Sequence, residues 1–329
     1  MNPLVSSLLP PSVPPIVPLA LGAFALMNLL FIVVMFLVWM ERKVAGHIQA
    51  RMGPMEVGYH GALQLVADAI KTMAKQDIIP KHADALLFRL APILIIVPAL
   101  TALSLIPFGR GLQFADLNIG LVLFLALTSL TSMVLLMAGW SSNNKYSLLG
   151  AMRSAAQDLS YEVALIFSTI GVVLVSGTLS LRGIVDAQSP VWNIVTQPLG
   201  FVLFFIAMVA ELNRTPFDLP EAESEIVAGY FTEYSGMRFI LFFLGEYVNM
   251  LVLSGLLTVL FLGGWHGVLL PGVVWFVLKV MLVVFVLMWM RWTFPRFRMD
   301  QLMGFGWKVL IPLSLLNILL TGLGVMLFG

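Results

Sequence analysis

Long apolar runs dominate the chain and recur at the length of a membrane-spanning helix. Such a helix needs about 20 predominantly apolar residues. The runs predict about eight of them, at residues 16–40, 85–106, 117–139, 156–178, 192–211, 238–262, 268–291 and 306–328. Because a helix satisfies its own backbone hydrogen bonds in lipid, the sequence predicts an all-α integral membrane protein, with residues 1–329 as a single membrane domain.

The first long connection contains a shorter amphipathic pattern, which predicts a surface helix at residues 59–79. The apolar positions repeat at helical spacing and comprise Leu63, Val66, Ala67, Ile70, Met73 and Ala74. The polar positions fall on the other face and comprise Gln64, Asp68, Lys71 and Lys75. A helix of this kind lies along the membrane surface. It either borders an entrance for a lipid-soluble molecule or seals the bundle.

Composition strengthens the membrane assignment and narrows the chemistry. Hydrophobic residues make up 60% of the chain, whereas soluble domains contain roughly 45–50%. The sequence contains no cysteine, which excludes disulfides, thiolate iron-sulfur ligation and cysteine-based zinc sites on this chain. The four histidines show no ligand spacing, so we expect no redox metal centre on this chain. A net charge of +1 gives no indication of a nucleic-acid partner.

Basic residues are distributed unevenly among the connections and predict the orientation. Lysine and arginine collect after the first, third, fifth and seventh spans, while the opposite connections carry little beyond Arg110 and Arg182. Basic loops stay in the cytoplasm, so both termini are expected on the outer, periplasmic side with the large loops cytoplasmic. No lysine or arginine precedes Arg42, which favours a bacterial plasma membrane over an organelle.

The connection at residues 212–237 is strongly acidic and predicts a functional surface. Its carboxylates are Asp218, Glu221, Glu223 and Glu225. Pro216 and Pro220 stiffen the backbone that carries them. A purely structural interpretation has Asp218 cap a short helix with Glu221 completing a capping box. That leaves the remaining acids, including Glu211 at the start of the loop, without a role.

Ionisable residues inside the predicted spans are costly, and they mark pathways by default. Asp158 and Glu162 lie four residues apart and hence on one helix face, where their like charges oppose joint ionisation. Glu246 and Lys279 come to similar depths at ~1.5 Å per residue, so we expect them to pair, as a static ion pair or as a proton relay.

All of these charges, together with Arg89 and Glu211, are predicted between the cytoplasmic face and the midplane. The outer half of the bundle is expected to hold no charge. A complete transport path usually needs polar groups in both halves. The pattern therefore predicts a half-channel that runs from the cytoplasm to the middle of the membrane.

A series of ordered motifs resembles the H subunit of proton-pumping NADH-quinone oxidoreductase, respiratory complex I. The motifs cover almost the whole chain after its proline-rich start. They are Glu41-Arg42-Lys43, Gln49 to Pro54, Gln64 to Asp68, Gly139 to Arg153, Ser160-Tyr161-Glu162, Pro216 to Glu223, and Glu233 to Met237.

The resemblance implies a membrane protein that forms much of a quinone-binding chamber and holds no redox cofactor. Quinone would be the substrate, with ubiquinone favoured. The implied partners are the hydrophilic iron-sulfur and quinone-site subunits, the small membrane subunits that lead to antiporter-like subunits, and lipids. The acidic loop would respond to quinone reduction through Asp218, Glu221, Glu223 and Glu225. The proton or charge path would comprise Glu211, Asp158, Glu162 and Glu246, to which the depth estimate adds Lys279. Candidates for the chamber or for docking are Arg42, Arg51 and Arg214.

Two alternatives keep some of these features. The homologous membrane subunit of an energy-converting hydrogenase or formate hydrogenlyase shares the architecture without binding quinone, but the intact run from Pro216 to Glu223 resembles the quinone-reducing branch more closely. A stand-alone secondary transporter would show repeated discontinuous helices. The sequence has neither an internal repeat nor predicted charges in the outer half.

Overall fold

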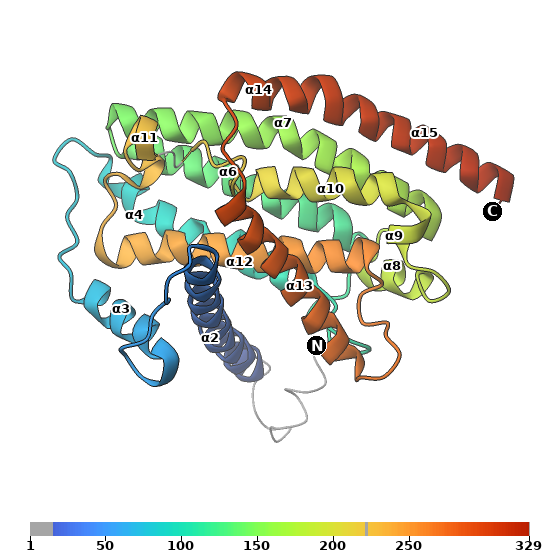
Figure 1. Cartoon of the computed structure of the whole chain (residues 1–329), viewed down its shortest axis with the longest axis horizontal. Coiled ribbons are helices and arrows are strands. Elements are labelled where there is room, and N and C mark those ends of the chain that lie inside the picture. Colours follow the sequence, from blue (N-terminus) through green and yellow to red (C-terminus); the bar gives the residue numbers. More distant parts are fainter. Residues whose placement is uncertain (1–15, 221–222, 329) are drawn as a thin grey trace.

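The computed structural model describes residues 16–220 and 223–328, which form a helical bundle (Figure 1). Within these residues the only β-type pairing is an isolated antiparallel bridge between Gly109 and Leu112. The fold class is therefore the all-α membrane protein that the apolar pattern predicts.

The elements follow one another along the chain with mostly short connections. They are α2 (Ile16–Ile48), η1 (Tyr59–Gly61), α3 (Gln64–Met73), α4 (Ala85–Leu94), α5 (Ile96–Leu105), α6 (Gly120–Ser141), α7 (Lys145–Ser176), α8 (Leu181–Ala187), α9 (Asn193–Thr196), α10 (Pro198–Glu211), α11 (Glu223–Ile226), η2 (Gly229–Phe231), α12 (Gly236–Phe261), α13 (Gly272–Thr293), α14 (Met299–Phe305), η3 (Gly306–Leu310) and α15 (Ile311–Phe328).

Among the described residues, six helical stretches are long and apolar enough to cross a membrane. They are Ala85–Leu105, Gly120–Ser141, Lys145–Ser176, Gly236–Phe261, Gly272–Thr293 and Met299–Leu327. Two of the eight predicted spans are not among these six stretches. The first lies within α2, whose 33 residues continue past the predicted end. The fifth is divided into α9 and the 14-residue α10, because Pro198 cannot continue α9 but fits the first turn of α10.

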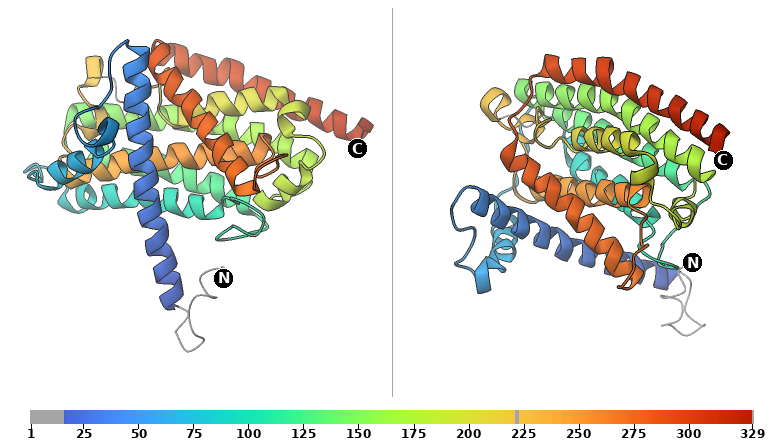
Figure 2. Two further views of the ribbon diagram at one scale, coloured as in Figure 1. Left: turned by 60° about the horizontal axis from the view of Figure 1, so that its bottom comes forward. Right: turned by 45° about the vertical axis from the view of Figure 1, so that its right-hand side comes forward.

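Helix α7 forms the centre of the bundle and packs against α6, α10 and α15. Helix α12 lies beside it and contacts α5, α13 and α2. Figure 1 shows α6, α7, α10 and α12 running in the same general direction, whereas α13 crosses them obliquely. In Figure 2, α2 crosses the bundle even more steeply. The C-terminal ends of α2 and α13 therefore meet over the side of α12.

Glycines at two contacts allow α7 to approach its neighbours closely. A Cβ on Gly139 of α6 would lie 2.3 Å from the Cβ of Ala151. A Cβ on Gly150 would lie 2.7 Å from the Cα of Gly229, which itself has a φ of +54°. Residues 229–231 are thus seated directly on the backbone of α7, and this contact fixes the end of the acidic loop.

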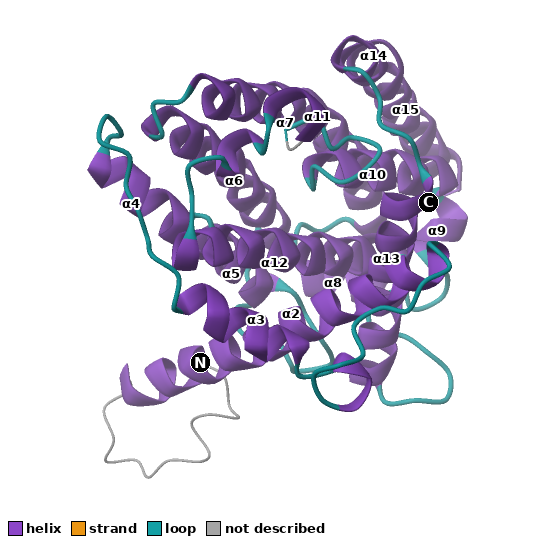
Figure 3. Ribbon diagram, turned by 60° about the vertical axis from the view of Figure 1, so that its left-hand side comes forward, coloured by secondary structure: helices purple, strands orange, loops and turns teal. Residues whose placement is uncertain are grey.

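The surface helix appears as α3, shorter than predicted, in the long connection that leads from α2 to α4 (Figure 3). The largest apolar side chains of its predicted face are exposed: Leu63, Val66, Ile70 and Met73. Its polar face is turned toward α2 instead, where Asp68 accepts a hydrogen bond from Arg42 at 2.7 Å. The apolar face of α3 is therefore exposed on the surface of this chain.

Candidate functional site

A cavity of about 800 Å³ lies where the C-terminal ends of α2 and α13 meet α12. Its lining combines apolar and charged side chains from these helices and from the loop that follows α2. The residues are Val38, Glu41, Arg42, Ala45, Arg51, Met52, Gly53, Pro54, Met55, Glu56, Phe243, Tyr247, Arg291 and Trp292. We call this cavity the chamber.

A buried carboxylate forms the polar centre of the chamber. Glu41 is 3% exposed and accepts a hydrogen bond from the Tyr247 hydroxyl at 2.7 Å. Nη1 of Arg214 lies 3.3 Å from its Oε1, and Arg291 donates to the same oxygen. The Arg214 guanidinium also stacks over the Tyr247 ring, 4.9 Å from the centroid. A carboxylate taken out of water needs such pairing, so these four side chains form one interdependent group.

The two predicted arginines of the first loop lie at the edge of the chamber. Arg42 pairs with Asp68 of α3, and the two side chains are 43% and 35% exposed. Nε of Arg51 donates to Oε1 of Gln49 at 2.7 Å. Both arginines line the cavity, whereas Arg214 is not a lining residue and is related to the chamber through its bond to Glu41.

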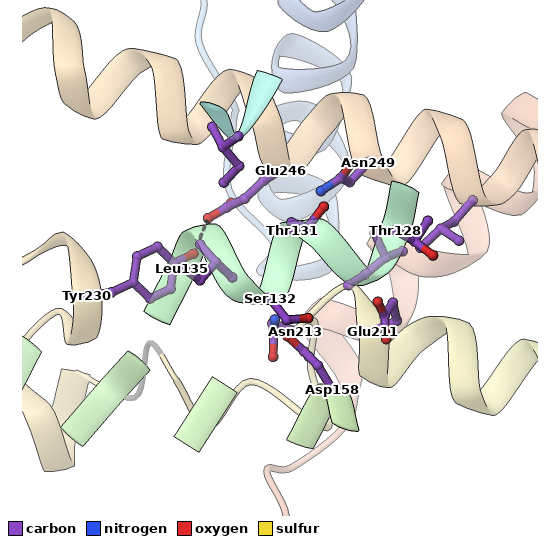
Figure 4. Close-up of a pocket in the computed structure, with 13 residues that line it drawn as sticks. Thr128, Thr131, Ser132, Leu135, Asp158, Glu211, Asn213, Tyr230, Glu246 and Asn249 are labelled. Carbon is purple, nitrogen blue, oxygen red and sulfur yellow. Dashed lines mark hydrogen bonds between the residues drawn. The ribbon is translucent and has the colours of Figure 1, made fainter. Parts of the chain in front are cut away.

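A second, water-sized cavity of about 30 Å³ lies between α6, α7, α10 and α12 (Figure 4). Its lining includes three of the predicted carboxylates, Asp158, Glu211 and Glu246. The polar side chains around them are Thr128, Thr131, Ser132, Asn213, Tyr230 and Asn249. We call these three acids, together with Glu162, the carboxylate cluster.

Each acid of the cluster is held differently. Oδ2 of Asp158 accepts from the Ser154 hydroxyl at 3.4 Å, and Glu162 accepts from Ser129 of α6. The Tyr230 hydroxyl donates to Oε1 of Glu246 at 3.2 Å. Within the described part of the chain, Oδ1 of Asp158 and Oε2 of Glu211 are buried without a hydrogen-bond partner. Buried polar atoms of this kind are usually satisfied by ordered water, for which the cavity has room.

The segment that leaves α10 connects the chamber to the cluster. Asn213 adopts a φ of +50°, a left-handed conformation that asparagine tolerates better than most residues. Nε2 of Gln157 in α7 donates to the Ala210 carbonyl at 2.8 Å, to Oδ1 of Asn213 at 2.9 Å and to the Phe217 carbonyl at 2.9 Å. Adjacent residues therefore contact the two sites: Asn213 lines the small cavity, and Arg214 is bonded to Glu41 of the chamber.

The acidic loop is tied down on both sides of residues 221–222. Oδ2 of Asp218 accepts from Nη2 of Arg296 at 2.9 Å, in the connection between α13 and α14. Glu225 pairs with Arg153 of α7 at 2.5 Å. Glu221 lies outside the described residues, and of the predicted Glu223 only the backbone position at the start of α11 is described. The predicted capping box between Asp218 and Glu221 therefore also lies outside the described residues.

Comparison with known proteins identifies the family. A family profile described as NADH dehydrogenase matches residues 21–322. The H subunit of NADH-quinone oxidoreductase from a Geobacillus species is 55% identical over 303 residues, covering 90% of this chain and 91% of the relative. The Bacillus cytotoxicus protein of the same name is 57% identical over 288 residues, or 86% of each chain. The Brevibacillus brevis protein of that name is 54% identical over 297 residues, covering 89% of this chain and 88% of the relative.

This chain belongs to the NADH dehydrogenase family. The matched residues include the chamber, the carboxylate cluster and the acidic loop, so both cavities lie within the part of the chain that the family shares. In the described residues of this NADH dehydrogenase family member, no group of three or more histidine, aspartate or glutamate side chains is arranged to hold a metal ion.

One expected pairing is wrong in this NADH dehydrogenase family member. Lys279 does not meet Glu246; its ammonium donates to the carbonyls of Leu262 at 2.6 Å, Gly264 at 3.0 Å and His266 at 2.7 Å. It also lies 4.1 Å from the centroid of the Trp192 ring. These partners follow the C-terminal end of α12, about 15 residues or roughly 22 Å along that helix from Glu246.

The depth estimate failed because it treated α12 and α13 as parallel rods of equal tilt. Helix α13 crosses obliquely (Figure 1), and Lys279 lies only seven residues after its first residue, Gly272. The long lysine side chain reaches the connection at residues 262–266. A charge is therefore present in the half of the bundle that was expected to hold none, and that expectation is also wrong.

Sequence reasoning missed three side chains of the chamber as site residues. Glu41 directly follows an apolar run, and Arg291 is the last residue of the seventh predicted span, where a basic residue is expected at the membrane boundary. Tyr247 follows Glu246 and therefore points to a different side of α12. The sequence does show a carboxylate near the end of α2 and an arginine near the end of α13. Whether these two side chains are in contact depends on the angle at which the helices cross, which the sequence does not give.

Proposed function

We propose that this chain is the membrane-arm subunit of an NADH:quinone oxidoreductase that forms much of the quinone-binding chamber and couples quinone reduction to proton translocation. The single observation that carries this function is the connection through Asn213 and Arg214. It joins a cavity large enough for a substrate to a buried set of carboxylates.

The chamber suits a quinone headgroup. Small-molecule sites are usually clefts of about 300–1,000 Å³ with apolar walls and a few placed polar groups. Here Val38, Ala45 and Phe243 supply apolar surface, while Tyr247 and Arg291 supply hydrogen-bond donors. The exposed apolar face of α3 lies beside α2, so a quinone with a long tail could approach the chamber from the lipid.

The polar group around Glu41 provides the coupling. Reduction of a quinone to a quinol takes up two electrons and two protons and changes the charge balance in the chamber. The electrons would come from iron-sulfur centres of a partner subunit, because this chain has no cysteine. Arg214 can pair more or less tightly with Glu41 as that balance changes. Its neighbour Asn213 is bonded to Gln157, so the change reaches Asp158 and Glu211.

The carboxylate cluster would hold and pass protons. Asp158, Glu211 and Glu246 line one small cavity, and Glu162 follows Asp158 by four residues on the same helix. A small shift of the 211–214 segment would change which of them carries a proton. Asp158, Glu162, Glu211 and Glu246 would thus start a proton or charge path, and Asp218, Glu221, Glu223 and Glu225 would respond to reduction. Lys279 belongs to this path only by the sequence estimate and has no contact with the cluster.

The same proposal places the chain among partners in a bacterial plasma membrane. Hydrophilic iron-sulfur and quinone-site subunits would cover the chamber and the acidic loop, and small membrane subunits would continue toward antiporter-like subunits. Both termini would be periplasmic. Ubiquinone is the favoured substrate, and the chain itself would carry no flavin, iron-sulfur cluster or metal.

The test begins with purification of the tagged chain from its native membrane in mild detergent. We expect flavin and iron-sulfur signals in absorbance and EPR spectra, together with inhibitor-sensitive NADH:quinone reductase activity. Tyr247→Phe should raise the KM for quinone severalfold. Tyr59→Phe, at a side chain that is 86% exposed, is the matched control and should leave the KM unchanged. A colourless chain that purifies alone would overturn the proposal.

A further inference from the structure

A groove between α2 and α13 lies on the side of α2 that faces away from the chamber. It has a volume of about 480 Å³. Its lining is Trp39, Met40, Lys43, Val44, His47, Ile48, Phe285 and Trp289. The floor is apolar, and the two polar side chains, Lys43 and His47, lie one helical turn apart on α2. We call this feature the α2–α13 groove.

Lys43, the lysine of the α2–α13 groove, lacks a carboxylate partner among the described residues. The Lys43 ammonium donates to the thioether sulfur of Met55 at 3.1 Å, a weak acceptor, and lies 6.0 Å from the centroid of the Trp39 ring. His47 is exposed, and its Nδ1 faces the Lys43 carbonyl at 2.8 Å. A second nitrogen of the His47 ring remains for an external group. The rim of the groove is therefore suited to an anion.

The groove also lies at the depth of a lipid headgroup. Lys43 and His47 belong to the last turns of α2, and Phe285 and Trp289 to the last turns of α13. Tryptophan and lysine near the ends of spanning helices mark the interface between hydrocarbon and water. Trp289 is 54% exposed and Phe285 is 45% exposed, so both rings offer apolar surface below a cationic rim.

We propose that the α2–α13 groove binds an anionic phospholipid, with its phosphate at Lys43 and His47 and an acyl chain against Phe285 and Trp289. The cationic rim distinguishes this occupant from a quinone, which is neutral and gains nothing from Lys43. The cationic rim also distinguishes this lipid from an apolar partner helix, which would leave the Lys43 ammonium without an anion.

The bound lipid would brace one wall of the chamber. Glu41 and Ala45 of α2 line the chamber, while Met40 and Val44 of the same turns line the groove. A lipid that fills the space between α2 and α13 limits how far α2 can move away from Arg291. This consequence rests on the proposed function, whereas lipid binding itself does not.

The test uses the intact purified complex in phosphatidylcholine vesicles that contain a trace of photoactivatable phosphatidylglycerol or, in parallel, photoactivatable phosphatidylcholine. Adducts are mapped by mass spectrometry onto residues 39–48 and 285–289. One favourable lysine contact corresponds to a preference of about fivefold. We expect the anionic probe to label these residues about fivefold more, and the Lys43→Gln/His47→Gln double variant to lose this preference.

Lys308→Gln is the matched control, because Lys308 is an exposed lysine near the start of α15 and outside the groove. It should leave the labelling of residues 39–48 unchanged. Equal labelling by both probes would overturn the proposal, as would labelling that a short-chain quinone or excess inorganic phosphate abolishes, or adducts confined to another subunit. An unchanged KM for quinone in Tyr247→Phe together with an intact lipid preference would count against the quinone chamber and leave the groove assignment standing, so the two proposals fail separately.

Discussion

Arg214 and Glu41 are 173 residues apart in sequence, yet Nη1 of Arg214 lies 3.3 Å from Oε1 of Glu41 in a site that is nearly closed to solvent. The pair joins α2 to the segment that leaves α10. The next residue toward α10, Asn213, lines the small cavity of the carboxylate cluster, so one peptide bond separates the residue bonded to Glu41 from a residue of that cavity.

Removal of the arginine should therefore affect both stability and substrate binding. Breaking a buried ion pair by removing one partner costs about 3–5 kcal/mol, and the remaining contact of Glu41 with Arg291 reduces this for Arg214→Gln to about 1–3 kcal/mol. We expect a lower midpoint of thermal inactivation for the complex and a higher KM for a short-chain quinone.

The matched control is Arg298→Gln, at a side chain that is 80% exposed, and it should change neither quantity. A double-mutant cycle with Glu41→Gln should show coupling, since the two side chains share one site. Strictly additive effects would contradict the interdependence of the group around Glu41.

Gln157 should hold the segment between the two sites in place. Its side-chain amide donates to three acceptors on this segment. Replacing Gln157 by leucine leaves these buried acceptors unsatisfied, and each costs about 1–3 kcal/mol. We expect Gln157→Leu to lower proton pumping more than electron transfer, measured as the ratio of protons to electrons in sealed vesicles. Gln76→Leu, at an exposed position, is the control, and equal ratios in both variants would count against the coupling role.

Two substitutions at the hydrogen bond between Tyr230 and Glu246 distinguish a role in proton transfer from a role in packing. Tyr230→Phe keeps the ring and removes the hydroxyl that donates to Glu246, whereas Glu246→Gln keeps the shape and removes the ionisable group. We expect Glu246→Gln to abolish most pumping and Tyr230→Phe to lower it only severalfold, as followed by a pH-sensitive dye. Normal pumping in Glu246→Gln would remove this acid from the path.

Lys279 should behave as a structural residue. Its ammonium joins three carbonyls of the α12–α13 connection, so Lys279→Met leaves these carbonyls without their donor. Less assembled complex in the membrane is the expected result, with an unchanged proton-to-electron ratio in the complex that does assemble. A changed ratio at normal assembly would restore the relay that the sequence suggested.

Acid should release α3 from α2. Partial burial alone would raise the pKa of Asp68, but the hydrogen bonds from Arg42 and Gln64 outweigh it and hold that pKa below its usual value of 3.8. The carboxylate form is thus favoured in the folded protein. Its stabilisation is fully present above the usual value and is lost as the pH falls through the lower folded value.

Pulsed hydrogen exchange of residues 64–73 should detect this release. After correction for the intrinsic pH dependence of amide exchange, the protection factors of the wild type should fall only below about pH 4, whereas Asp68→Asn should show lower protection factors that no longer depend on pH in this range. A pH-independent wild type would mean that the Arg42–Asp68 pair does not hold α3.

The sequence predicted features that depend on local pattern. The apolar runs indicated the helices because length and hydropathy decide whether a segment can be buried in lipid. The spacing of Leu63, Val66, Ile70 and Met73 indicated a surface helix, and the structure exposes these side chains. Isolated acids such as Asp158 and Glu211 stood out because ionisable residues are rare in spanning segments, and the structure brings both to one cavity.

The remaining features depend on how the helices cross. Glu41 and Arg291 meet because α2 and α13 cross α12 at different tilts, and no local pattern encodes a tilt. The same tilt separates Lys279 from Glu246 although their estimated depths agree. The backbone turn at Asn213 places it in one site and Arg214 in the other, and nothing in the sequence of the loop distinguished these two residues.

The fixed ends of the acidic loop determine how it can meet another protein. Asp218 is bonded to Arg296, Glu225 is paired with Arg153, and Gly229 is seated on Gly150. A surface that is already ordered loses little conformational entropy when a partner docks, and preorganisation of this kind raises affinity without any added contact. If the proposed partner subunits bind beside Asp218 and Glu225, they would therefore meet side chains that are already held in position.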